Sequence, residues 1–135
     1  MIKRRFKFWD YNVSHNQLLI RSPKNEEFNT NIDIKFIGVS YLDIPTTMTG
    51  FLFSEPSIDE VSKVKLNLPG KSESDKIFVL SSLNNRYIVV AKFCGVSENE
   101  LDIFETTLEI FGHEAEKWEK LKEAYNNENL FINLT

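Results

Sequence analysis

Length, composition and charge restrict this chain to a small group of protein classes. With 135 residues, 41% apolar and 27% charged, it has the make-up of one globular domain, which we expect to span residues 1–135. No apolar run approaches the roughly 18 residues of a membrane-spanning helix, and the basic N-terminus lacks the apolar centre of a signal peptide. The single cysteine excludes an internal disulfide, so we expect a cytoplasmic protein.

The net charge of −4 conceals an uneven distribution. Residues 1–96 carry 13 Lys and Arg against 10 Asp and Glu, a net +3, whereas residues 97–135 carry 3 against 10, a net −7. The plainest interpretation is a solvated helix and strand. The alternative is an acidic surface for a basic protein partner, which would also repel nucleic acid.

The first predicted element in chain order is a β-hairpin. Residues 4–13 alternate, with Phe6 and Phe8 on one face and Trp9 and Tyr11 on the other. After a polar turn, residues 17–21 can pair back on this strand. Basic residues between aromatic ones are also typical of surfaces that bind single-stranded nucleic acid, but the acidic remainder of the chain argues against that use.

Two further strands are predicted after a polar loop. Residues 31–42 alternate until the parity changes near Gly38, which indicates a bulge or a face becoming buried. Pro45 ends this strand because proline cannot donate to a sheet, and residues 46–53 form the next one.

Residues 54–70 give a mixed signal. Ser57 and Glu60 have the spacing of a capping box, which favours a helix start. Residues 63–68 alternate between charged and apolar side chains, which favours a strand. We therefore expect a short helix at most, followed by a short edge strand.

The centre of the sheet is predicted at residues 76–95, KIFVLSSLNNRYIVVAKFCG. Two short apolar runs, rich in β-branched and aromatic residues, flank the turn-forming residues 82–86, and this arrangement is typical of a β-hairpin. Alternation places Tyr87 and Val89 on one face of the second strand and Ile88 on the other.

The C-terminal third is predicted to contain a strand and a helix. Residues 101–109 fit both a helical and a two-residue period; we favour a strand paired with residues 87–93 and keep the helix as the alternative. Residues 113–126 form an amphipathic helix with acidic residues in its first turn. The predicted fold class is α+β: mainly antiparallel β-sheet, of about six to eight strands, with one C-terminal helix packed on a face.

Residues suited to enzyme chemistry are sparse. The two His and one Cys have no metal-binding spacing, and the five Gly are scattered, so we expect no metal, no cofactor and no catalytic residue. We expect Cys94 to be buried as a small apolar residue. The alternative function is a small ligand-binding or enzymatic domain with a cleft near Trp9, Tyr11, His15 and Arg21.

Two stretches, FWDYNVSHNQLLIRS (residues 8–22) and NELDIFETTLE (residues 99–109), resemble small uncharacterised bacterial proteins, some of them encoded beside polymorphic toxins and assigned as immunity proteins. The resemblance implies a non-enzymatic cytoplasmic inhibitor that covers the active site of a toxin. An acidic surface would suit a basic toxin domain, because it mimics phosphate charge and steers association. The residues expected to bind this protein partner are Glu98, Glu100, Asp102, Glu105 and Glu109.

Overall fold

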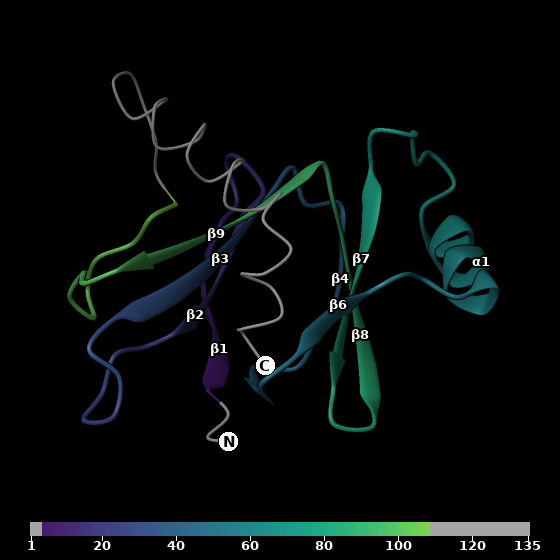
Figure 1. Ribbon diagram of the computed structural model, residues 1–135. Coiled ribbons are helices and arrows are strands. Elements are labelled where there is room, and N and C mark those ends of the chain that lie inside the picture. Colours follow the sequence, from purple (N-terminus) through teal and green to yellow (C-terminus); the bar gives the residue numbers. More distant parts are fainter. Residues whose placement is uncertain (1–3, 109–135) are drawn as a thin grey trace.

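The structure is a computed structural model that describes residues 4–108, and it consists of two antiparallel β-sheets and one short helix (Figure 1). The five-stranded sheet has the order β5 (Thr47–Thr49), β1 (Arg5–Asn12), β2 (Gln17–Ser22), β3 (Asn31–Ile37) and β9 (Phe93–Asn99). The four-stranded sheet has the order β4 (Tyr41–Asp43), β8 (Asn85–Ala91), β7 (Lys76–Ser82) and β6 (Leu52–Ser54). The helix α1 (Ile58–Asn67) follows β6. The antiparallel, β-rich architecture is confirmed, but the strands form two sheets rather than one.

In its described part, the chain passes from one sheet to the other four times: from β3 to β4, from β4 to β5, from β5 to β6, and from β8 to β9. Backbone hydrogen bonds from Lys92 N to Ile37 O (3.0 Å) and from Ser40 N to Val90 O (2.9 Å) continue the pairing around one such corner. Gly38 lies at this corner with φ +68°, a conformation that a side chain disfavours. The parity change near Gly38 therefore marks the place where the chain changes sheet.

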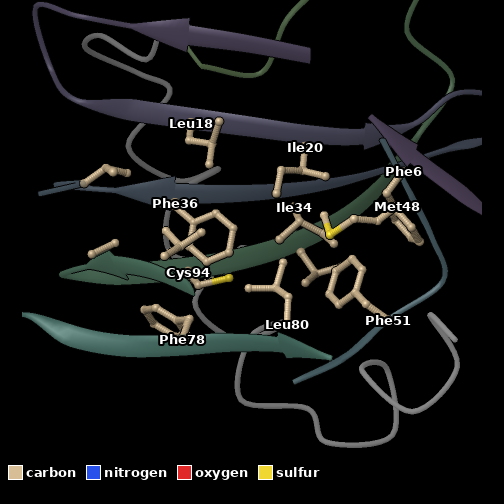
Figure 2. Packing of buried hydrophobic residues seen from close by; sticks show 14 of the residues in the cluster. Phe6, Leu18, Ile20, Ile34, Phe36, Met48, Phe51, Phe78, Leu80 and Cys94 are labelled. Carbon is tan, nitrogen blue, oxygen red and sulfur yellow. The ribbon is translucent and has the colours of Figure 1, made fainter. Parts of the chain in front are cut away.

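The main core lies between the two sheets, where phenylalanine rings from several strands meet (Figure 2). The Phe6 and Phe51 rings are 4.9 Å apart and the Phe36 and Phe78 rings 5.4 Å apart, both edge to face, which is a favourable geometry for aromatic pairs. Branched aliphatic side chains fill the space between the rings. The buried members of this cluster are Phe6, Leu18, Ile20, Ile32, Ile34, Phe36, Val39, Met48, Phe51, Phe78, Leu80, Val89, Ala91, Cys94 and Val96.

The predicted central hairpin is confirmed. β7 and β8 pair along their whole length and occupy the middle of the four-stranded sheet. Val89 enters the main core and Tyr87 packs against it, whereas Ile88 belongs to a second cluster on the opposite face, as the alternation predicted. The turn differs in one detail, because its positive φ of 55° falls on Leu83 rather than on an asparagine.

The helix α1 begins at the predicted capping box but runs further than predicted. The Ser57 hydroxyl accepts from Glu60 N, and the Glu60 carboxylate accepts from Ser57 N. The strand predicted over residues 63–68 is wrong, since the helix continues to Asn67. Val64 is the one fully buried helix residue and packs in the second cluster, so docking on the sheet outweighs the local alternation.

The helix predicted over residues 113–126 lies outside the described residues and stays a prediction. The one helix that the described part contains, α1, is in the middle of the chain. Within residues 4–108, no helix is long and apolar enough to cross a membrane.

The first hairpin is confirmed, with a change of face in β1. β1 and β2 pair as an antiparallel hairpin whose register shifts between Phe8 and Asp10. This bulge reverses the alternation, so Tyr11 packs against the same core cluster as Phe6, contrary to the predicted faces. Trp9 lies at the bulge, half-buried, above the outer face of the five-stranded sheet.

Candidate protein-binding site

The outer face of the five-stranded sheet carries charged side chains that are buried. Arg21 is 0% exposed, and Asp33 and Lys35 are each 1% exposed. The Arg21 guanidinium donates to both Asp33 carboxylate oxygens, from Nε at 2.6 Å and from Nη2 at 2.9 Å. This two-point ion pair gives each buried charge a partner, without which its burial would be strongly unfavourable.

Further groups complete a polar network around this ion pair. Asn99 Nδ2 donates to Asp33 Oδ2 at 2.9 Å, and the Thr107 hydroxyl donates to the same oxygen at 3.3 Å. The Arg21 guanidinium carbon lies 5.2 Å from the centre of the Trp9 ring, within cation–π range. The network therefore joins the first hairpin to the chain that follows β9.

The chain after β9 forms a strap, residues 100–108, which side chains of β2, β3 and the loop between them hold on this face. Its backbone carbonyls accept hydrogen bonds from amide or cationic side chains. The hydrogen bonds are charge-assisted where the donor is Lys or Arg. The donors and the strap carbonyls they reach are Lys24 to Glu100 (2.8 Å), Asn31 to Leu101 (2.9 Å), Arg21 to Glu105 (2.9 Å), and Lys35 to Thr107.

The strap corrects the prediction for residues 101–109. Residues 101–108 form neither the favoured strand nor the alternative helix, and the strand that pairs in this region is β9, whose neighbour is β3. Side chains of Arg21, Asn31 and Lys35 donate hydrogen bonds to carbonyl oxygens of the strap. In a strand, these oxygens would accept from backbone N–H groups of a neighbouring strand. Glu109 lies outside the described residues.

The middle of the strap is a tight turn, here called the tip, residues 102–105. Glu105 N donates to Asp102 O at 3.0 Å, and Asp102 N donates to Glu105 Oε1 at 2.9 Å. At the tip Ile103 is 60% exposed and Phe104 is 95% exposed. Two adjacent large apolar side chains thus stand in solvent on a turn that hydrogen bonds close on itself.

Four exposed acidic residues lie along β9 and the strap. The carboxylates of Glu98, Glu100, Asp102 and Glu105 belong to exposed residues of β9 and the strap, and residues 97–108 contain no Lys or Arg. The Glu98 carboxylate accepts from the Thr30 hydroxyl at 2.8 Å. The four described members of the predicted partner-binding set are therefore exposed, although Asn99 and Leu101 between them are partly buried.

Sequence reasoning did not single out Ile103 and Phe104. Phe104 fits the helical template and Ile103 fits the two-residue alternation, so each was used only to decide between a helix and a strand. The available signal was their position between Asp102 and Glu105, because two apolar residues enclosed by acidic ones are poorly placed for a core.

The four residues of the alternative cleft do not line one surface. Trp9 and Arg21 lie together on the outer face, but the Arg21 guanidinium is occupied by Asp33 and by the strap. Tyr11 packs on the inner face and donates its hydroxyl to Asn16 Oδ1 at 3.2 Å. His15 is exposed in the turn between β1 and β2.

The one cysteine and the possible metal ligands complete the survey of reactive side chains. Cys94 is fully buried in the main core, as predicted, and burial raises the pKa of its thiol well above the ordinary value. In the part of the chain from residue 4 to residue 108, no three His, Cys, Asp or Glu side chains are grouped so that they could hold a metal ion.

Comparison with known proteins gives no match to a protein-family model, to a curated protein or to a solved structure. The function is therefore argued from the geometry of the strap, its tip and the carboxylates around them.

Proposed function

We propose that this chain is a non-enzymatic, cytoplasmic protein-binding domain whose acidic surface binds a basic protein partner. The observation that carries the proposal is the run of exposed carboxylates on β9 and the strap, in a stretch without a single basic residue. Such a surface raises the association rate with a positively charged protein and disfavours nucleic acid.

The attachment of the strap supports this function. A flexible acidic loop would lose conformational entropy when it bound, whereas this strap is already held by hydrogen bonds from β2, β3 and Lys24. The binding surface is thus formed before the partner arrives.

A narrower proposal is that the protein is an immunity protein that neutralises a bacterial toxin by covering a basic active site. The described residues of the two stretches that resemble such proteins, residues 8–22 and residues 99–109, are in contact in the fold. The first contains Trp9 and Arg21, and the second contains the tip that Arg21 helps to hold. A toxin domain that cleaves nucleic acid would present the basic surface that fits these carboxylates.

The direct test is binding to the product of the adjacent gene. The protein and the purified neighbour are mixed, and affinity is measured by calorimetry at several salt concentrations. We expect a complex whose affinity falls as salt rises. If the neighbouring product forms no complex at low salt, the proposal fails.

A matched pair of triple variants locates the contact. Neutralising Glu98, Glu100 and Asp102, as Gln, Gln and Asn, should slow association and flatten the salt dependence. Neutralising three exposed acidic residues near α1 changes the net charge equally and should have little effect; these are Glu55, Asp59 and Glu73. Equal loss in both variants would show that overall charge, rather than the strap surface, determines binding.

A further inference from the structure

We propose that Phe104, assisted by Ile103, is the anchor of this interface and inserts into an apolar pocket of the partner that has Lys or Arg at its rim. This inference rests on the proposed function and adds the contact residue and the chemistry of the partner's site.

The exposure of Phe104 is the first argument. A phenylalanine buries about 150–250 Å² when it is covered, and large aromatic residues of this kind are frequent anchors at protein interfaces. In this chain most phenylalanines of the described part lie in or against the core, whereas Phe104 is 95% exposed beside an exposed Ile103. A partner that covers both side chains buries apolar surface that is exposed to solvent in the free protein, and this burial stabilises the complex.

The rigid setting of the tip is the second argument. Asn31 holds Leu101 O on one side of the tip, and Arg21 holds Glu105 O on the other. Arg21 is itself fixed by its two bonds to Asp33. The anchor is therefore presented by a short turn whose two ends are tied to the sheet, which lowers the entropy lost on binding.

The charge beside the anchor defines the pocket. Insertion of Phe104 brings the carboxylates of Asp102 and Glu105 against the edge of the pocket that receives it, because these residues are the two ends of the tip. A wholly apolar or acidic edge would leave them desolvated without a partner. A pocket with an apolar floor and a basic edge satisfies both the ring and the carboxylates.

The same charge argument sets aside the two nearest alternative occupants. Residues 109–135 of this chain carry 6 Asp and Glu against 3 Lys, a net −3, and a second copy of the chain carries −4. Either one would bring like charge to an acidic tip. A basic partner is the occupant that charge complementarity favours.

The experiment compares Phe104→Ser with Ile58→Ser in the full chain, with the adjacent gene product as the probe. Ile58 is a suitable control because it is 86% exposed and starts α1, which lies on the opposite side of the molecule from the chain that follows β9 (Figure 1). We expect Phe104→Ser to weaken binding by about 30-fold or more, mainly through faster dissociation, and Ile58→Ser to bind as wild type does. The urea midpoint of Phe104→Ser should equal that of wild type.

The outcomes separate this inference from the proposed function. If the carboxylate triple variant binds weakly but Phe104→Ser stays within about threefold of wild type, the anchor is refuted and the acidic surface stands. A lower urea midpoint for Phe104→Ser would show that the ring packs within its own chain, which also refutes the anchor. If wild type binds nothing, the proposed function fails and this inference fails with it.

Discussion

Replacing Asp33 with asparagine should lower the free energy of unfolding by about 3–5 kcal/mol, the usual cost of removing one partner from a buried ion pair. The Arg21 and Asp33 side chains are each 1% exposed, so the variant leaves a guanidinium buried without its counter-charge. Lys35, two residues along β3, is a second buried cation on the same face and adds to the penalty. The bonds from Asn99 and Thr107 to Asp33 are weakened as well.

Urea unfolding followed by circular dichroism measures this effect. With a slope of about 2 kcal/mol per molar urea, the midpoint of Asp33→Asn should fall by about 1.5–2.5 M. Asp43→Asn is the matched control, because Asp43 forms an ion pair with Lys63 at 2.7 Å in which both side chains are about half exposed. This exposed pair should contribute no more than about 1 kcal/mol.

A double substitution tests whether the instability of Asp33→Asn comes from a buried charge that has lost its partner. Arg21→Met combined with Asp33→Leu removes both charges of the ion pair, and such a variant should be more stable than Asp33→Asn, because it does not leave the Arg21 guanidinium buried without its counter-charge. If Asp33→Asn behaves like Asp43→Asn, the strap does not bury the ion pair and the account of its attachment is wrong.

Three further predictions concern other parts of the fold. The hydrogen bond from Arg86 lowers the pKa of Glu60 from 4.5 to about 2. The ionised Glu60 carboxylate therefore stabilises the folded protein above pH 4.5, and this contribution is lost as the pH falls toward 2. The stability deficit of Glu60→Gln in urea titrations should therefore shrink over that range, and a deficit that stays constant would contradict the ion pair. Cys94, buried and with a raised thiol pKa, should react with a thiol reagent only after unfolding by urea; fast labelling of the native protein would show that the core is open there. Gly38→Ala should destabilise the protein by about 1–2 kcal/mol, since φ is +68° and an added Cβ would lie 3.0 Å from Lys92 Cγ; an unchanged urea midpoint would contradict the corner geometry.

Local features of the sequence were sufficient to identify the two hairpins and the start of α1. A two-residue period, a polar turn and a second run of β-branched residues specify a hairpin through neighbouring contacts alone. The Ser57–Glu60 capping box acts within one helical turn, so its spacing was enough to place the start of the helix.

Contacts between distant parts of the chain decided the rest. The alternation of residues 63–68 predicted a strand, but the packing of Val64 against the four-stranded sheet stabilises a helix there. The bulge between Phe8 and Asp10 changed which side chains of β1 face the core. The local sequence pattern did not predict this bulge.

By itself, the sequence determined the β-rich architecture, the central hairpin and an acidic stretch late in the chain, because these depend on side chains near one another along the chain. Only the tertiary structure decided that Arg21 and Asp33 pair beneath the strap and that Phe104 stands in solvent at its tip. Arg21 contacts a residue 12 positions away and a carbonyl 84 positions away, and partners at such separations leave no periodic trace in the sequence.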